Sequence, residues 1–75
     1  MNLTETLQHI LSNAFPGAMI QVESADQIHF NAQIRAPQFK GLSRIAQQKS
    51  VYAGLGDLIS KGTVHALSLK TEILE

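Results

Sequence analysis

The ten residues 61–70, KGTVHALSLK, decide the fold, because a helix ends within them and a strand begins. Gly62 suits the left-handed backbone position that commonly follows the last turn of a helix. After it, residues 64–70 have strand character, and the imidazole of His65 opens that run. The stretch therefore predicts a strand over residues 64–70 with a helix directly before it.

The preceding segment, residues 44–60, has the apolar spacing of a helix. The apolar residues expected near one face are Ile45, Tyr52, Leu55 and Ile59, flanked by Val51 and Leu58. Ser43 is a suitable N-cap for this helix. Gly54 and Gly56 each cost roughly 1 kcal/mol relative to alanine inside a helix. We therefore expect close packing against the sheet, or a break, near these two glycines.

The first half of the chain predicts a helix and a hairpin. Residues 3–15 carry an apolar stripe at helical spacing, with Asn2 or Thr4 as the cap. Residues 18–23 and 28–36 read as strands joined by a short turn, which favours an antiparallel hairpin. Pro37 ends the second strand because it cannot donate to the ladder. In the connector that follows, Phe39 and Leu42 are expected to enter the core.

The elements predict one α+β domain over residues 1–75, in the order α-β-β-α-β. A single three-stranded sheet is expected, covered on one face by the helices. Hydrophobic residues make up 44% of the chain and charged residues 16%, which is typical of a globular domain. There is no cysteine, so no disulfide is expected. No apolar run approaches the roughly 20 residues that span a bilayer, and the start does not resemble a signal peptide, so we expect a cytoplasmic protein.

The formal net charge is zero, but the acids avoid the middle of the chain. No acid lies in residues 27–56, and that window carries four cations: Arg35, Lys40, Arg44 and Lys49. Such a surface could meet phosphates or an acidic partner, or simply be a solvated face. No two glycines lie three residues apart, so the Gly-x-x-Gly loop with which KH domains clamp a nucleic-acid backbone is missing.

Taken in order, several segments resemble the BolA-like family across nearly the whole chain. They are Ile28-His29-Phe30, residues 39–44 (FKGLSR), Val51-Tyr52 with Leu55, and residues 64–71 (VHALSLKT). The short hairpin loop and Gln47-Gln48 are similar to the smaller bacterial branch called YrbA-like. The resemblance implies a fold like the type II KH domain, and it places the family's near-constant histidine at His65.

The resemblance also implies two reported roles. One is partnership with a monothiol glutaredoxin, with which a bridging 2Fe–2S cluster is shared in iron–sulfur trafficking or iron sensing. The other is binding of duplex DNA in transcriptional control of stress and morphology. Two departures bear on these roles. Gln47-Gln48-Lys49 stands where the family often has Arg-His-Arg, and the hairpin loop is too short to carry the extra His or Cys ligand of some relatives.

His29 is the candidate second metal ligand. Strand alternation places His29 on the open face, together with Asn31 and Gln33, whereas His65 shares its side with Leu67 and Leu69 on the covered face. The two imidazoles could then meet only at a strand end or bulge. When the family resemblance is left aside, His65 can also be interpreted as a structural histidine held by hydrogen bonds. Asp26 is explained by turn chemistry.

We therefore expect an adaptor whose His65 joins a cluster, with the glutaredoxin cysteine and glutathione supplying the sulfurs. The isolated chain, a monomer or homodimer, is expected to hold no cofactor. Docking is expected on Lys40, Gly41, Ser43 and Arg44, near the start of the third strand. The alternatives are a DNA-binding regulator that uses Lys40, Arg44 and Lys49, and a protein-binding module in which His65 is only structural. No residue set of an enzyme is present in the sequence.

Overall fold

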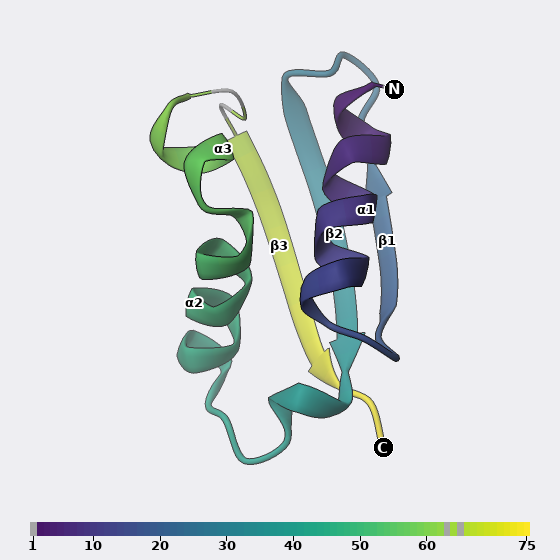
Figure 1. Ribbon diagram of the computed structural model, residues 1–75, viewed down its shortest axis with the longest axis vertical. Coiled ribbons are helices and arrows are strands. Elements are labelled where there is room, and N and C mark those ends of the chain that lie inside the picture. Colours follow the sequence, from purple (N-terminus) through teal and green to yellow (C-terminus); the bar gives the residue numbers. More distant parts are fainter. Residues whose placement is uncertain (1, 63, 65) are drawn as a thin grey trace.

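The computed structural model describes residues 2–62, 64 and 66–75, and it has the predicted α+β architecture (Figure 1). The elements in chain order are α1 (Leu3–Ala14), β1 (Met19–Glu23), β2 (His29–Ala36), the 3-10 helix η1 (Pro37–Phe39), α2 (Arg44–Leu55), α3 (Asp57–Ser60) and β3 (Ala66–Ile73). The predicted order α-β-β-α-β is confirmed, with the second helical segment divided into α2 and α3.

The sheet is mixed, with the strand order β1-β2-β3. β1 and β2 form the predicted antiparallel hairpin, in which Met19 pairs with Arg35. β3 runs parallel to β2, from the pair His29–Ala66 at one end to the pair Ala36–Ile73 at the other. A parallel pair cannot be joined by a tight turn. The segment between Ala36 and Ala66, which contains α2 and α3, is therefore a crossover connection.

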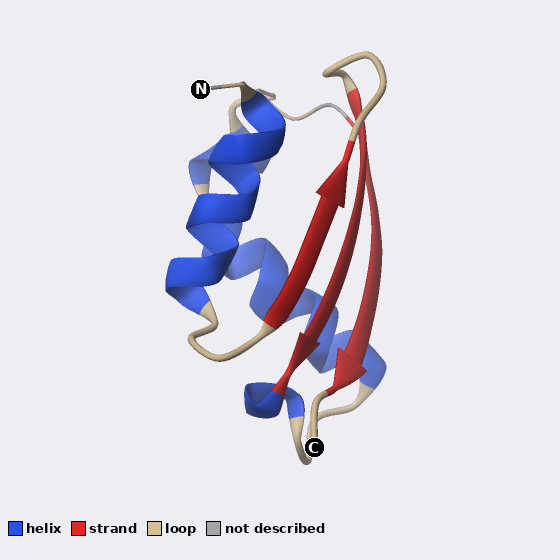
Figure 2. Ribbon diagram, turned by 90° about the vertical axis from the view of Figure 1, so that its right-hand side faces the viewer, coloured by secondary structure: helices blue, strands red, loops and turns tan. Residues whose placement is uncertain are grey.

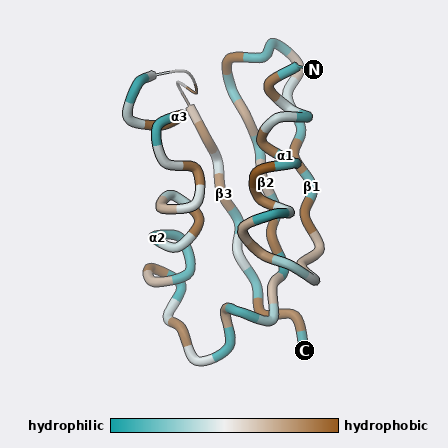
Figure 3. Tube along the Cα trace, viewed as in Figure 1, coloured by the Kyte–Doolittle hydropathy of each residue, from teal (hydrophilic) through white to brown (hydrophobic). Residues whose placement is uncertain are grey.

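All the helices lie on one face of the sheet, as Figure 2 shows. β2 explains why, because its side chains alternate strictly between exposed and buried. Phe30, Ala32, Ile34 and Ala36 point into the core, while the residues between them face away from the helices. The same alternation is visible along the strands when the trace is coloured by hydropathy (Figure 3). The prediction that His29 lies on the open face is confirmed.

The predicted helix ends are confirmed by their hydrogen bonds. The side chain of Asn2 accepts a hydrogen bond from the backbone N–H of Glu5 at 2.9 Å. The hydroxyl of Ser43 accepts one from the N–H of Ala46 at 3.2 Å. The expected break is at Gly56, where φ is +54° and α2 ends. Each cap satisfies an N–H that the helix itself leaves unpaired.

The predicted apolar face of the long helix is confirmed for Leu55 and for Val51 at its flank, but it is wrong for Ile45 and Tyr52. Ile45 is 68% exposed and Tyr52 40% exposed, whereas the buried positions of α2 are Gln47, Val51 and Leu55. These three are spaced four residues apart, so α2 presents only a narrow stripe to the rest of the protein. Gln47 is tolerated there because its Nε2 donates a hydrogen bond to the backbone carbonyl of Leu42 at 2.9 Å.

The connector after β2 fits its prediction only in part. Phe39 is fully buried, and its ring meets that of Phe15 edge to face, with 5.4 Å between the ring centroids. Leu42 was expected in the core but is 37% exposed. The backbone carbonyl of Leu42, rather than its side chain, contributes to the interior by accepting the hydrogen bond from Gln47. β3 extends to Ile73, beyond the predicted end at residue 70.

Candidate functional site

His29 is the described candidate ligand, and it lies at the end of the sheet where β3 begins. Its parallel register partner is Ala66. His65 precedes Ala66 in the sequence but lies outside the described residues, so its predicted face and role are untested. The side chain of His29 is 73% exposed. A solvent-accessible imidazole therefore stands beside the described start of β3.

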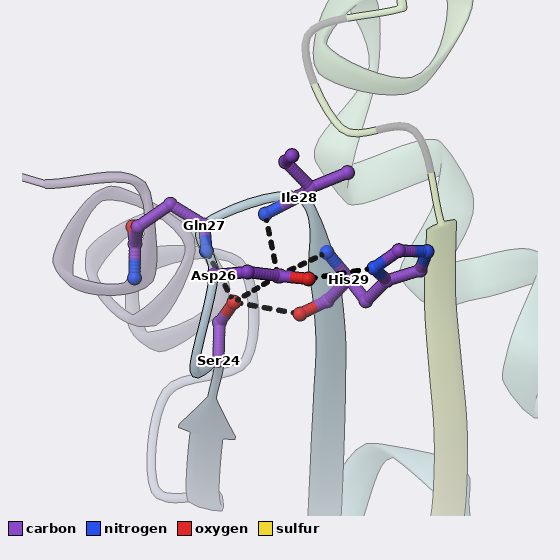
Figure 4. Close-up of polar contacts among 5 residues, drawn as sticks. All are labelled: Ser24, Asp26, Gln27, Ile28 and His29. Carbon is purple, nitrogen blue, oxygen red and sulfur yellow. Dashed lines mark hydrogen bonds and ion pairs between the residues drawn. The ribbon is translucent and has the colours of Figure 1, made fainter.

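A network within the β1–β2 loop holds His29 in place (Figure 4). Nδ1 of His29 lies 2.8 Å from Oδ2 of Asp26. The other carboxylate oxygen, Oδ1, accepts hydrogen bonds from the backbone N–H groups of Ile28 at 2.9 Å and His29 at 2.8 Å. The hydroxyl of Ser24 donates to the carbonyl of His29 at 2.6 Å. One carboxylate thus binds both the backbone and the side chain of the same histidine.

The loop is also attached to α1 through Gln27. Its side-chain amide donates to Oγ1 of Thr4 at 2.9 Å and accepts from the N–H of Thr4 at 3.3 Å. The N–H of Gln27 donates to the hydroxyl of Ser24 at 2.9 Å. The φ of Gln27 is +60°, an uncommon value for a residue with a side chain. These bonds compensate for the backbone conformation and hold the loop against the helix.

The same contacts determine the charge of Asp26. The hydrogen bond from the His29 side chain, and after it the N–H groups of His29 and Ile28, hold the pKa of Asp26 well below its ordinary value of 3.8. Asp26 is therefore an anion at neutral pH and can only accept hydrogen bonds. Nδ1 of His29 must then be the donor. Within the described part of the chain, Nε2 has no hydrogen-bond partner, so its lone pair can bind a metal or accept a proton.

The described residues offer no complete metal site by themselves. No group of three or more His, Asp or Glu side chains among residues 2–62, 64 and 66–75 is arranged to hold a metal ion. Asp26 and the other carboxylates are oxygen donors, which suit a sulfur-bridged iron cluster poorly. An imidazole nitrogen suits such iron. The donor set around His29 therefore fits a cluster only where another molecule supplies the remaining ligands.

The predicted docking residues lie at the opposite end of the sheet. Arg44 lines a small cleft of about 120 Å³ together with Gln48 and residues 69–72, in the second half of β3. The expectation that residues 40–44 lie near the start of the third strand is wrong. Because β3 runs parallel to β2, the connector that leaves the end of β2 meets the end of β3 (Figure 1).

That end of the molecule carries a surface that is both basic and apolar. Lys40, Gly41, Ser43, Arg44 and Lys49 are all exposed, and no ion pair involves the three cations within the described residues. Lys49 shares a helix face with the exposed Ile45 and Tyr52. Arg35, the fourth cation of the acid-free window, is different. It lies on the open face of the sheet, 3.5 Å from Glu72.

Sequence reasoning missed the partnership of Asp26 with His29. Both residues were singled out, but Asp26 was assigned to the turn and His29 to the strand. Their spacing of three residues across a strand start was the available signal.

Among the described residues, no helix is long and apolar enough to cross a membrane.

Comparisons with known proteins agree with this fold. The sequence profile of the BolA-like protein family matches residues 11–75. The uncharacterised protein RP812 of Rickettsia prowazekii is 38% identical over 69 residues, covering 89% of this chain and 88% of its own. The acid stress protein IbaG of Escherichia coli K12 is 34% identical over 64 residues, covering 85% and 75%. The structure of a BolA homologue from Coxiella burnetii superposes with a TM-score of 0.81 at 28% identity, covering 97% and 92%. With its fold and most of its length matched in this way, the chain belongs to the BolA-like family.

Proposed function

We propose that the protein is an adaptor that shares a bridging 2Fe–2S cluster with a monothiol glutaredoxin. In this proposal His65 supplies one nitrogen ligand and His29 is the candidate for a second. The glutaredoxin cysteine and glutathione supply the sulfurs, because this chain has no cysteine. Membership of the BolA-like family supports the proposal.

The observation that carries the proposal is the register of β2 against β3. His29 pairs with Ala66, which follows His65 directly in the sequence. The two histidines lie 36 positions apart in the chain (65 − 29), yet the parallel pairing brings Ala66, the described neighbour of His65, beside His29. This register supports a ligand pair at a strand end, the one arrangement that strand alternation left open.

A nitrogen ligand would also suit transfer of the cluster. Replacing thiolate by neutral imidazole raises the potential of an iron–sulfur cluster, as two-histidine centres show in stronger form. The exposure of His29 supports access by a second protein. Docking is then expected at the end of the sheet that carries His29. Arg44 borders residues 69–72 of β3, which pair with residues 32–35 of β2. It therefore lies about three to six strand residues from His29, roughly 10–20 Å at the usual rise of a strand.

The test is cluster assembly with a monothiol glutaredoxin, glutathione, iron and sulfide under anaerobic conditions. Visible absorption and circular dichroism report the ligand set. We expect His65→Ala to change the spectra of the mixed complex, His29→Ala to change them as well, and His9→Ala on the exposed side of α1 to leave them unaltered. Unchanged spectra in His65→Ala would remove His65 from the ligand set.

The basic surface at the other end supports a second candidate, binding of duplex DNA by Lys40, Arg44 and Lys49. Their exposure and their lack of ion pairs within the described residues favour contact with phosphates. Three phosphate contacts predict a slope of about −3 for the logarithm of the binding constant against the logarithm of salt concentration. Each single alanine variant should reduce the slope by about 1. Lys61→Ala, whose amine lies 3.5 Å from Asp57, is the matched control.

The two candidates are separable because His29 and Arg44 lie at opposite ends of the sheet. Variants of the histidines should leave any DNA binding intact, and variants of the three cations should leave the cluster spectra intact. A salt slope near zero, or no binding at low salt, would end the DNA candidate. A glutaredoxin complex that forms equally well without iron would instead indicate a protein-binding module.

A further inference from the structure

We propose that Asp26 is a positioning residue that keeps the proton of His29 on Nδ1 and leaves Nε2 as the nitrogen offered to a metal. The proposal deepens the cluster-sharing function and rests on it for the identity of the metal. The assignment of the proton itself rests only on the geometry of the free protein, so it can be tested without a cluster.

The first argument is that the two oxygens of Asp26 have separate partners. Oδ1 is held by the N–H groups of Ile28 and His29, at 2.9 and 2.8 Å. Capping a turn uses only this oxygen. Oδ2 is left for the imidazole, and it lies 2.8 Å from Nδ1. The backbone therefore orients the carboxylate, and the carboxylate in turn orients the ring.

The second argument is that the carboxylate of Asp26 lies in a loop that other hydrogen bonds hold in place. Ser24 accepts from the N–H of Gln27 and donates to the carbonyl of His29, and Gln27 is joined to Thr4 of α1 by two hydrogen bonds. A half-exposed aspartate in a freely moving hairpin could not fix an imidazole. Here the loop is held at its strand end by the bond from Ser24 to His29 (Figure 4) and on its helix side by the bonds between Gln27 and Thr4.

The third argument is chemical. An ionised carboxylate cannot donate, so a neutral His29 in this contact must carry its proton on Nδ1. Nε2 then keeps its lone pair and points away from Asp26. Metal-binding histidines generally use this arrangement, in which one ring nitrogen donates to a carboxylate and the other binds the metal. Asp26 supplies that carboxylate within the same loop.

The deciding variant is Asp26→Asn. The amide oxygen can still accept from the two backbone N–H groups, so the turn is preserved. Its NH₂ group takes the place of Oδ2 and donates to Nδ1, which forces the proton onto Nε2. In serine proteases the equivalent aspartate-to-asparagine change leaves the geometry intact but selects the wrong tautomer. Glu23→Gln is the control, because it also replaces a carboxylate of this hairpin by an amide but does not change the partner of Nδ1.

The readout is a long-range ¹H–¹⁵N correlation spectrum of the imidazole of His29 in the free protein at pH 8.5, above the ordinary histidine pKa of about 6.5. We expect the Nδ1–H tautomer in the unmodified protein and in Glu23→Gln, and the Nε2–H tautomer in Asp26→Asn. An unmodified protein with the proton on Nε2, or with the same tautomer in Asp26→Asn, would overturn the proposal.

The second readout is cluster binding in the mixed complex with glutaredoxin. Loss of an outer partner of a ligating histidine typically costs about 10–100-fold in metal affinity. We expect a loss in that range for Asp26→Asn and less than about 3-fold for Glu23→Gln. The tautomers can switch as expected while His29→Ala leaves cluster binding unchanged. In that case Asp26 does position the ring, and the result contradicts only the proposed role of His29 as a cluster ligand. If His29→Ala weakens the cluster and Asp26→Asn does not, the positioning role is refuted.

Discussion

Gln47, a polar residue inside the core, donates a hydrogen bond from its side-chain Nε2 to the backbone carbonyl of Leu42, 2.9 Å away. The side chain is only 7% exposed. The bond ties the middle of α2 back to the connector that precedes it. The exposed cations Lys40 and Arg44 therefore lie on a segment that this buried hydrogen bond holds in place.

We expect Gln47→Ala to lower the free energy of unfolding by about 1–2 kcal/mol, because it removes a buried hydrogen bond and leaves a carbonyl without its partner. Urea denaturation followed by circular dichroism measures the change. Lys49→Ala, two positions further along the same helix and exposed, should stay within about 0.5 kcal/mol. Equal effects of the two substitutions would show that the bond to Leu42 does not support α2.

The two apolar residues of the connector should differ sharply. Phe39 is completely buried against Phe15, so Phe39→Ala should cost about 3–5 kcal/mol. That is a large part of the roughly 4–11 kcal/mol expected in total for a domain of this size. Leu42→Ala should cost less than about 1 kcal/mol, because its side chain is already partly in water. Thermal unfolding of the two variants measures the contrast. A larger loss of stability in Leu42→Ala than in Phe39→Ala would show that the side chain of Leu42 lies in the core, as the sequence predicts.

Two nearby glycines should respond in opposite directions to alanine. A Cβ at Gly54 would meet Cβ of Ala14 at 3.4 Å, an ordinary contact. Gly54→Ala should therefore stabilise the protein by up to about 1 kcal/mol through helix propensity. Gly56 has a φ of +54°, which costs a residue with a side chain about 1–2 kcal/mol. Denaturant midpoints of the two variants measure the difference, and loss of stability in both would point to crowding between α1 and α2.

The folded protein should lose stability in acid partly through Asp26. Its pKa is lower when folded than its ordinary value of 3.8, because His29 and two backbone N–H groups bind the ionised form. Its contribution is therefore fully present above that ordinary value and is lost as the pH falls below it toward the folded pKa. We expect the urea midpoint to fall less between pH 6 and pH 2.5 in Asp26→Asn than in the unmodified protein. Parallel curves would show that Asp26 does not couple folding to pH.

The fold followed from the sequence wherever one side of an element was clearly polar. In β2 the alternation from His29 to Ala36 identified the covered face correctly, because the open face is exposed to water and selects polar side chains. The capping roles of Asn2 and Ser43 could also be predicted from the sequence, since their hydrogen bonds are local.

The prediction failed where the pattern of apolar residues alone does not determine which residues are buried or which way a strand runs. The helix α2 exposes Ile45 and buries Gln47, and only the bond to the carbonyl of Leu42 makes that exchange acceptable. The position of residues 40–44 was wrong for a related reason. Spacing along the chain does not reveal that β3 pairs in parallel with β2, and that direction decides which end of the sheet each loop meets.

The parallel pairing of β2 with β3 also bears on the order in which the protein assembles. The β1–β2 hairpin is local and can form early, whereas β3 must wait until the whole crossover has been made, because distant pairings close large loops. We therefore expect the end of the sheet where Ala66 pairs with His29 to form late in folding. A nascent or partly unfolded chain lacks this end, so under the proposed function only the fully folded molecule would bind a cluster there.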